Sequence, residues 1–379
     1  MTLPEPITTA ALFLHELHGP LVWETLQIPS LAPDEIAVDI HATGICHTDL
    51  MLMSGELPSP QPGVFGHEGA GTIRQTGAAI THVRPGDHVL LSFDFCTRCA
   101  NCTAKHPAYC AAFALLNTAG HRADGSSPLQ TATGGAVYSK FFGQSCFSRV
   151  AVVGGRCAIP VSSGLDLRVL APLGCGMQTG AGAVVNVLRL RAGQSVAVFG
   201  TGAVGLAAVM AARIVGAEVI VAVDVREERL RMARELGATH TVNPAALQEG
   251  NGVVGAIQAV TGGLGVQFAV ECSGVPAVVP LMLAALRARG RAVSVGAAGI
   301  TEEVRFNLFA HLMGGKEYVG CIEGDVYPPE FVPWLVERYA HGEFPVDKLV
   351  RVYKVRDYEE AFADVREGKV IKAVLDWTE

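Results

Sequence analysis

Residues 195–224 read SVAVFGTGAVGLAAVMAARIVGAEVIVAVD, and this stretch decides the fold class of the chain. Its first five residues form a continuous apolar run, which is typical of a strand covered on both faces of a parallel sheet. Residues 203–215, rich in alanine and valine, predict a helix, and residues 218–223 predict the next strand. A strand, a helix and a second strand indicate a βαβ unit, so we expect an α/β fold with a doubly wound parallel sheet.

A glycine-rich turn, GTGAVG, joins the first strand to the helix. Gly200, Gly202 and Gly205 have the spacing of a dinucleotide-binding turn. Such a turn brings backbone N–H groups and a helix N-terminus close to a pyrophosphate. Asp224 follows Gly205 by 19 residues and ends the second strand, where it would bind the adenosine ribose and repel a 2′-phosphate. NAD is therefore favoured as the cofactor, while Arg226 keeps NADP open as an alternative.

The alternation of strands and helices continues through residues 177–322. A helix is predicted at 226–236, with Gly237 ending it, and further strands are predicted at 267–270 and 291–295. We expect this segment to form one dinucleotide-binding domain.

The chain on either side of this segment has a different composition. Residues 1–176 are rich in glycine, proline and threonine and contain short β-type runs such as 36–40, which predicts a mostly β domain. Residues 323–379 predict a helix near 329–341 and a strand-like tail at 370–377. We expect this last segment to return to the first domain.

Four cysteines in the first domain have the spacing of a metal site. Cys96, Cys99, Cys102 and Cys110 read C-x2-C-x2-C-x7-C, and four thiolates can complete a closed tetrahedral zinc site. An iron–sulfur cluster is the first alternative, although the bacterial ferredoxin run continues as C-x3-C-P and this one does not. A nucleic-acid-binding zinc module is the second. We expect structural zinc that stabilises a lobe of the domain.

A second set of candidate ligands is spread over a longer stretch. It consists of Cys46, His67 with its neighbour Glu68, and Cys175, each in a glycine-rich context. Two thiolates and one imidazole with a vacant fourth position are typical of a catalytic zinc site. The sequence therefore indicates two metal sites of different kinds.

Bulk composition narrows the class of protein. The chain has 379 residues and a net charge of −7, which disfavours a nucleic-acid partner. No uncharged apolar stretch of about 18 residues is present, so no membrane span is predicted. Ten cysteines in a chain of this length are not a disulfide scaffold, and the N-terminus has no basic segment typical of a signal peptide. We expect a cytoplasmic metalloprotein.

The chain resembles the zinc-dependent medium-chain alcohol dehydrogenases over essentially its whole length. Five motifs carry the resemblance: GICHTD at 44–49, GHEGAG at 66–71, the four-cysteine lobe at 96–110, GCG at 174–176 and GTGAVG at 200–205. The resemblance implies a GroES-like catalytic domain interrupted by a Rossmann domain. It also implies oxidation of an alcohol to an aldehyde, with NAD and with one catalytic and one structural zinc ion per chain.

The resemblance assigns roles to the second set of ligands. It implies that Cys46, His67 and Cys175 bind the catalytic zinc, and that Glu68 approaches the metal transiently. Asp49 looks like the carboxylate that orients the imidazole of His67.

Further roles are carried over position by position. Thr48 matches the hydroxyl that hydrogen-bonds the alcohol. The matches to cofactor contacts are His47 and Lys372 for the pyrophosphate, Thr179 and Val204 for the nicotinamide side, and Arg229 for the adenosine ribose. Liver-type relatives have a proton-relay histidine where this chain has Met51, so the relay from Thr48 must end in water or in another base.

Two segments resemble bacterial benzyl-alcohol and aryl-alcohol dehydrogenases, namely FFGQSCFSRVAVV at 141–153 and LGCGMQTGAGAVVNVL at 173–188. The positions that match the substrate pocket of the family are Phe93, Leu116, Phe142, Ala297 and Ile322. These aromatic and aliphatic side chains suit a primary aromatic or allylic alcohol. Alternatively, Phe93 and Phe142 are ordinary core residues.

Other functions and assemblies stay open at this point. A glutathione-dependent formaldehyde dehydrogenase and an aliphatic alcohol dehydrogenase share the same motifs, and a non-catalytic relative that binds NAD and zinc is a third alternative. The segment between Cys110 and Phe141 is long and polar, which favours a homodimer over a tetramer by resemblance.

Overall fold

The computed structural model describes residues 6–58, 60–247 and 252–379. The chain divides into two compact units. Unit 1 contains the described residues of Met1–Cys175, together with Tyr327–Val336 and Val346–Glu379. Unit 2 contains the described residues of Gly176–Val326, together with Glu337–Pro345. No helix of the described residues is long and apolar enough to cross a membrane.

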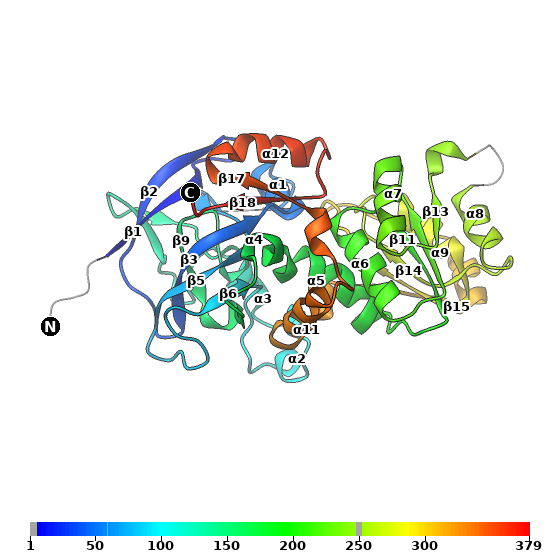
Figure 1. The fold of residues 1–379 in the computed structure, drawn as a ribbon, viewed down its shortest axis with the longest axis horizontal. Coiled ribbons are helices and arrows are strands. Elements are labelled where there is room, and N and C mark those ends of the chain that lie inside the picture. The colour runs from blue at the N-terminus through cyan, green and yellow to red at the C-terminus, as the bar shows by residue number, and fades with distance from the viewer. Residues whose placement is uncertain (1–5, 59, 248–251) are drawn as a thin grey trace. The chain divides into compact units, whose positions relative to one another are not determined.

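Unit 1 is built on two sheets (Figure 1). The five-stranded sheet has the order β4-β1-β2-β7-β8, and its strands are β1 (Ile7–Leu14), β2 (Leu21–Ile28), β4 (Gly63–Val64), β7 (Leu129–Thr131) and β8 (Ala136–Val137). The larger sheet has the order β10-β6-β5-β3-β18-β17, with β9 also paired to β3. Its strands are β3 (Glu35–Gly44), β5 (Glu68–Thr76), β6 (His88–Leu91), β9 (Val150–Gly154), β10 (Ala158–Val161), β17 (Val350–Lys354) and β18 (Lys372–Asp376).

Strand β3 organises the larger sheet because it is buried along most of its length. Its last residue, Gly44, lies opposite Glu68 of β5 on one side and Val374 of β18 on the other. The segments that carry Cys46 and His67 therefore leave the sheet side by side. The pairing of β18 with β3 also returns the C-terminal tail to the larger sheet of unit 1.

The helices that lie wholly within unit 1 are short, with four to nine residues each. They are α1 (His47–Met53), α2 (Ala100–Thr103), α3 (Phe113–Asn117), α4 (Leu167–Leu170) and α12 (Tyr358–Arg366), while α11 (Pro328–Ala340) belongs partly to each unit. The segment 323–379 is thus divided between the two units, because residues 337–345 group with unit 2, where Phe344 is fully buried.

Unit 2 contains a six-stranded parallel sheet in the order β13-β12-β11-β14-β15-β16, which is the doubly wound Rossmann order. The strands are β11 (Ser195–Phe199), β12 (Val219–Val223), β13 (His240–Val242), β14 (Val266–Glu271), β15 (Leu286–Ser294) and β16 (Glu317–Gly320). The helices are α5 (Gly176–Gly182), α6 (Ala203–Ile214), α7 (Glu227–Leu236), α8 (Val253–Ala259), α9 (Val278–Ala285) and α10 (Leu308–Gly314).

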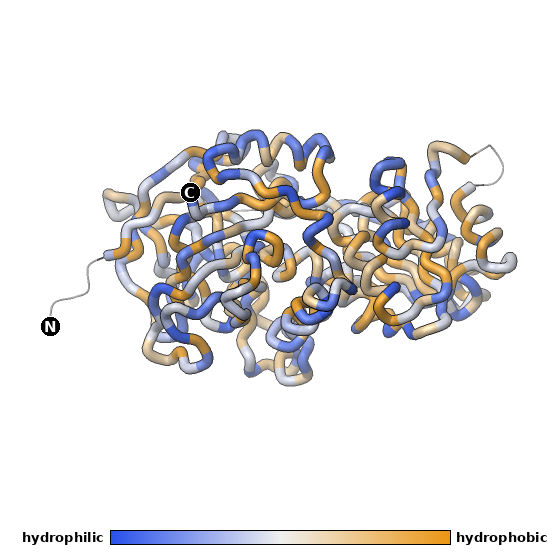
Figure 2. Tube along the Cα trace, viewed as in Figure 1, coloured by the Kyte–Doolittle hydropathy of each residue, from blue (hydrophilic) through white to orange (hydrophobic). Residues whose placement is uncertain are grey.

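The sequence pattern of unit 2 explains this layering. Strand β12 is apolar throughout and β11 is apolar after Ser195, whereas α7 is largely hydrophilic (Figure 2) and buries only Leu230, Ala233 and Leu236. Helices α6 and α7 pack together, as do α8 and α9, so that the sheet has helices on both faces (Figure 1). The predicted α/β class, with a mostly β first part and a doubly wound parallel sheet, is confirmed.

The element predictions differ in detail from the structure. The strand at 195–199 and the helix at 203–215 are present as β11 and α6, but α8, α9, α10 and α12 were not predicted. Helix α9 reads VVPLMLAA, which has no polar face and contains a proline, so its residues give no helical periodicity.

Candidate metal and dinucleotide sites

Three of the predicted ligands meet in unit 1. Cys46 precedes α1, His67 precedes β5, and Cys175 follows the turn at Ala171–Gly174. One ligand atom from each side chain lies within 4.8 Å of those of the other two, and His67 and Cys175 are buried. The close packing of the GCG segment requires Gly174, because a Cβ atom there would lie 1.8 Å from the carbonyl oxygen of Leu91.

Asp49 holds two of these three segments together. Its Oδ2 accepts a hydrogen bond from the backbone N–H of Cys46 at 2.9 Å, which closes a capping box at the start of α1. Its Oδ1 accepts from the backbone N–H of Gly66 at 3.2 Å and lies 3.0 Å from Nδ1 of His67. The hydrogen bond that the resemblance implied between Asp49 and His67 is therefore present, and it leaves Nε2 of His67 for a metal.

The electrostatics of this group favour a cation. The hydrogen bond of the Cys46 thiol with Cys175, together with the charge of the neighbouring His67, holds the pKa of this thiol well below its usual range. Burial alone would lower the pKa of His67, but the negative charges of Asp49 and Cys46 raise it well above its ordinary value. Nε2 of His67 is buried and makes no hydrogen bond of ordinary geometry with the described residues. Two thiol sulfurs and this nitrogen fit a zinc ion with one position left over.

Glu68 follows His67 in the chain and forms an ion pair with Lys372. The ammonium of Lys372 is 2.8 Å from Oε1 of Glu68 and donates to the carbonyl oxygen of Ile45 at 3.2 Å, and both side chains are buried. Burial raises the pKa of Glu68 to about 7 in spite of the nearby ammonium. The pyrophosphate contact assigned to Lys372 stays a prediction.

The first turn of α1 carries the remaining predicted residues of this segment. Thr48 is half-buried, and its Oγ1 is 3.7 Å from Sγ of Cys46. His47 is exposed. Met51, at the position of the relay histidine, is only 2 % exposed, so its side chain belongs to the core of unit 1.

Two phenylalanine rings pack against the imidazole of His67. Phe142 stacks on the imidazole with a centroid distance of 4.7 Å, and Phe141 meets it edge-on at 5.0 Å. Phe113 contacts Phe142 at 6.1 Å and Phe93 at 6.0 Å. The structure thus places Phe93 and Phe142 in one cluster of rings beside His67, and it adds Phe113 and Phe141, which were not predicted.

The other pocket residues are distributed over both units. Leu116 is half-buried in α3, the helix that also contains Phe113. Ala297 and Ile322 are exposed residues of unit 2. A part in substrate binding stays a prediction for all three.

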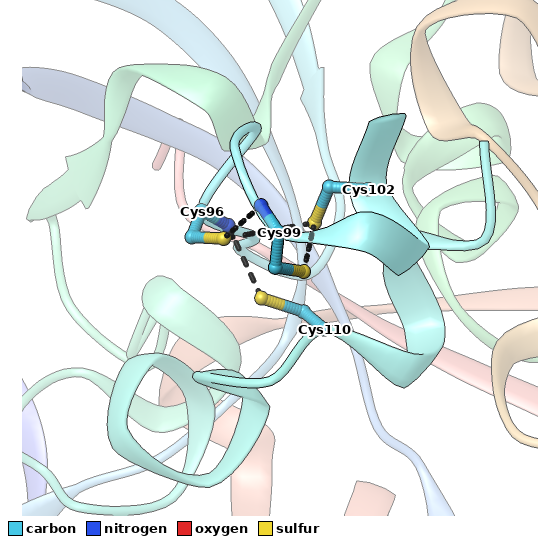
Figure 3. A group of neighbouring side chains, drawn as sticks. All are labelled: Cys96, Cys99, Cys102 and Cys110. Atoms are coloured by element: carbon cyan, nitrogen blue, oxygen red, sulfur yellow. Dashed lines mark hydrogen bonds between the residues drawn. The ribbon is translucent and has the colours of Figure 1, made fainter. Parts of the chain in front are cut away.

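The four cysteines of the lobe form a second group (Figure 3). Sγ of Cys102 lies 3.5 Å from Sγ of Cys99 and 3.9 Å from Sγ of Cys96, too far for a disulfide. Backbone N–H groups point at the sulfurs, from Cys99 to Cys96 at 3.4 Å and from Cys96 to Cys110 at 3.3 Å. A hydrogen bond from the backbone N–H of Ala111 is the main cause that lowers the pKa of Cys99 to about 6. This arrangement fits a closed four-thiolate zinc site.

The glycine-rich turn of unit 2 has the geometry that its spacing predicts. Gly200 has a φ of +84°, where a side chain is unfavourable. A Cβ atom at Gly205 would lie 1.9 Å from the carbonyl oxygen of Gly200, so a glycine is needed for close approach of α6 to the turn. A Cβ atom at Gly202 would meet no atom of the described residues within 4 Å, so the backbone is open to a pyrophosphate there.

Asp224 lies beside this turn. Its Oδ2 accepts hydrogen bonds from the backbone N–H and the hydroxyl of Thr201 at 2.7 and 2.9 Å, and its Oδ1 accepts from the backbone N–H of Arg226 at 3.0 Å. Arg229, in α7, has a buried Nε with no hydrogen-bond partner among the described residues. Asp224 therefore shapes the turn in addition to the ribose contact predicted for it.

Thr179 and Val204 lie on neighbouring helices of unit 2. Helix α5 carries Thr179, and Val204 is the second residue of α6. A Cβ atom at Gly180 would lie 1.9 Å from the carbonyl oxygen of Val204, so the two helices meet at this glycine. The nicotinamide contacts assigned to both residues stay predictions.

Comparison with known proteins decides the family. Residues 32–163 match the alcohol dehydrogenase GroES-like domain, and residues 203–340 match the zinc-binding dehydrogenase domain. A geraniol dehydrogenase of Castellaniella defragrans is 39% identical over 370 residues, which cover 97% of this chain and 98% of that protein. The chain belongs to the zinc-dependent medium-chain alcohol dehydrogenases.

Solved structures of this dehydrogenase family agree closely with the chain. An alcohol dehydrogenase zinc-binding domain protein from Burkholderia ambifaria has a TM-score of 0.95 and 41% identity, covering 99% of this chain and 100% of its own. A benzyl alcohol dehydrogenase from Acinetobacter calcoaceticus has a TM-score of 0.93 and 36% identity, covering 98% and 99%.

The geometry around Asp49 predicts the effect of removing its charge from this alcohol dehydrogenase. Asp49→Asn keeps the size of the side chain, but its amide nitrogen must face the N–H of Cys46 or that of Gly66, both of which are donors. We expect kcat/KM for alcohol oxidation to fall 10- to 100-fold, with weaker zinc retention during dialysis. Asp39→Asn is the control, since Asp39 pairs with Arg74 at the surface. Equal loss in both variants would contradict the role of Asp49.

Proposed function

We propose that this enzyme oxidises primary aromatic or allylic alcohols reversibly to aldehydes, with NAD as the hydride acceptor and two zinc ions per chain. The observation that carries the proposal is the buried group of Cys46, His67 and Cys175, with aromatic rings packed against the imidazole. The group supplies the metal ligands, and the rings supply a flat apolar surface for a substrate.

Different residues of unit 1 have different roles in the proposed reaction. Cys46, His67 and Cys175 would hold a zinc ion, which would act as a Lewis acid and make an alcohol hydroxyl more acidic. Asp49 fixes the imidazole of His67, and Oγ1 of Thr48 accepts a hydrogen bond from the alcohol hydroxyl, whose proton leaves through this relay to water or to another base. Bound NAD+ would accept a hydride from the alcohol carbon, so that alcohol and NAD+ would yield aldehyde, NADH and one proton.

Two observations support the substrate class. Phe93, Phe113, Phe141 and Phe142 form a connected cluster of rings beside His67, and such a surface favours planar apolar groups. Two of the relatives are named for geraniol, an allylic alcohol, and for benzyl alcohol, an aromatic one.

A panel of alcohols tests the proposal directly. NADH formation by the purified enzyme is measured with benzyl alcohol, cinnamyl alcohol, geraniol, hexanol, ethanol and 2-propanol. We expect kcat/KM for the first three to exceed that for ethanol by at least about 100-fold, or about 2.7 kcal/mol. A preference for ethanol or 2-propanol would contradict the substrate class and leave the family unchanged.

Cofactor choice is expected to depend on Asp224. In Asp224→Ser the carboxylate that would bind the ribose and repel a 2′-phosphate is gone, so we expect KM for NAD to rise about 10-fold and activity with NADP to increase. The steady-state constants with both cofactors measure this change. Thr201→Val is the control, because it removes one hydrogen bond to Asp224 and keeps the charge. An unchanged ratio of NAD to NADP activity in Asp224→Ser would contradict this role.

The partner that we propose is a second copy of the chain. Helix α10 exposes four large apolar side chains on one face, with exposed fractions from 68% to 72%: Leu308, Phe309, Leu312 and Met313. An apolar face of this kind is typical of a subunit interface. The edge strand β16 also ends the sheet of unit 2 and offers backbone groups for pairing.

The oligomer is expected to depend on this face. In Phe309→Glu/Leu312→Glu, two charges would be buried in the interface, so we expect light scattering to give the mass of a monomer where the unchanged enzyme gives a dimer. Leu264→Glu is the matched control, because Leu264 is an equally exposed leucine elsewhere in unit 2. A dimer that survives the double substitution would place the interface elsewhere.

A further inference from the structure

Gln144 is a buried amide at the centre of unit 1, within the segment FFGQSC. Its side chain is 1% exposed and uses all of its hydrogen-bonding groups. Nε2 donates to the carbonyl oxygens of His67 at 3.0 Å and Ser92 at 2.9 Å. Oε1 accepts from the backbone N–H of Gly69 at 3.2 Å and from Sγ of Cys146 at 3.2 Å.

These contacts join the chain segments that carry two of the proposed ligands. The carbonyl of His67 and the N–H of Gly69 bracket the His67-Glu68 pair. Ser92 links Gln144 to the Cys175 segment. Its carbonyl oxygen accepts from Gln144, and its buried hydroxyl donates to the carbonyl oxygen of Gly174, next to Cys175, at 2.8 Å. A single amide, with one serine, therefore fixes the backbone at both ligands.

The chemistry of the amide explains why glutamine suits this position. Two carbonyl oxygens need two donors, and one N–H group needs an acceptor, which a neutral amide supplies together. A glutamate would place a carboxylate oxygen against a carbonyl oxygen, and a methionine would remove the donor from both buried carbonyl groups. An asparagine is one methylene shorter and cannot span both carbonyls.

We propose that Gln144 is a positioning residue that holds His67 and Cys175 in the geometry of the catalytic metal site. The inference rests on the proposed function, which assigns these two residues as metal ligands. Gln144 acts only through the backbone of His67 and, by way of Ser92, of Gly174. Its loss should therefore loosen the metal without removing a ligand.

Zinc release from the purified holoenzyme tests this inference. Transfer of zinc to an excess of a chromogenic chelator is followed over time, and the phase that belongs to the catalytic site is the one absent in Cys46→Ser. In Gln144→Met we expect this phase to be 10- to 100-fold faster than in the unchanged enzyme, while the other phase keeps its rate. We also expect kcat to fall while KM for the alcohol changes less than about threefold.

Asn117→Leu is the matched control. Asn117 is also a fully buried amide, and it binds the backbone of Asp94 on the side of the four-cysteine lobe. Its replacement should lower the melting temperature about as much as Gln144→Met and leave the catalytic zinc phase unchanged. If Gln144→Met and Asn117→Leu shift only the melting temperature, Gln144 is merely structural and the inference is overturned.

A second variant tests the inference in case Gln144→Met does not fold. Gln144→Asn keeps an amide and a similar polarity, so it decides the question if Gln144→Met yields no folded protein. Its catalytic zinc phase should be faster than that of the unchanged enzyme, and an unchanged phase would overturn the inference. A different failure, in which the unchanged enzyme and Cys46→Ser hold the same amount of zinc, would count against the proposed function.

Discussion

Cys46→Ser is expected to reduce alcohol oxidation by at least about 1,000-fold, which corresponds to about 4 kcal/mol of lost transition-state stabilisation. Cys46 offers one of the two sulfur ligands of the proposed catalytic site, and the hydroxyl of serine is a far weaker ligand for zinc at neutral pH. Zinc content, measured by mass spectrometry after dialysis, should fall from two ions to one per chain.

The choice of serine separates chemistry from folding. Cys46 is the N-cap of α1, and serine is a preferred residue at an N-cap, so the capping box with Asp49 can be kept. The melting temperature and the far-UV circular dichroism should therefore change little. Cys157→Ala is the control, because Cys157 is a buried cysteine outside both metal groups, and it should retain two zinc ions and its activity. A Cys46→Ser enzyme that still holds two zinc ions would remove Cys46 from the ligand set.

The sequence predicts best those parts of this chain in which short-range pattern and chemistry coincide. The turn at 200–205 is one example, because the close packing at Gly205 is against the carbonyl oxygen of Gly200, only five residues away in the chain. The four-cysteine lobe is another, since its ligands lie within 15 consecutive residues, 96–110. In both segments local spacing alone restricts the geometry.

Long-range contacts limit the prediction of the other site. The resemblance supplied Cys46, His67 and Cys175, but it did not supply Gln144, which meets His67 from 77 residues away along the chain. Phe113 and Phe141 were missed for the same reason, because nothing near them in the sequence shows that they contact Phe142 and His67. The doubled phenylalanine in FFGQSC was a usable signal for Phe141, whereas Phe113 had none.

The lobe around the second metal group is expected to be the part of unit 1 most dependent on zinc. Its helices, α2 and α3, have four and five residues, which is too short for stability without tertiary support. The backbone N–H groups of Cys99 and Cys96 point at sulfur atoms, and these bonds are stronger when the thiols are ionised, as they are when they bind a metal. The order of the lobe thus depends on the four sulfurs being held together.

Cys102→Ser is therefore expected to destabilise the enzyme by about 4 kcal/mol, which lowers the melting temperature by about 5 °C. Trypsin should cut at Arg98 and Lys105 at least about tenfold faster than in the unchanged enzyme, because local unfolding exposes these bonds. Cys46→Ser should show the opposite pattern, with lost activity and normal resistance to trypsin. If Cys102→Ser were as stable and as resistant as Cys46→Ser, the four cysteines would not be a structural metal site, and the order of the lobe would have to come from the buried amide of Asn117 and its bonds to Asp94.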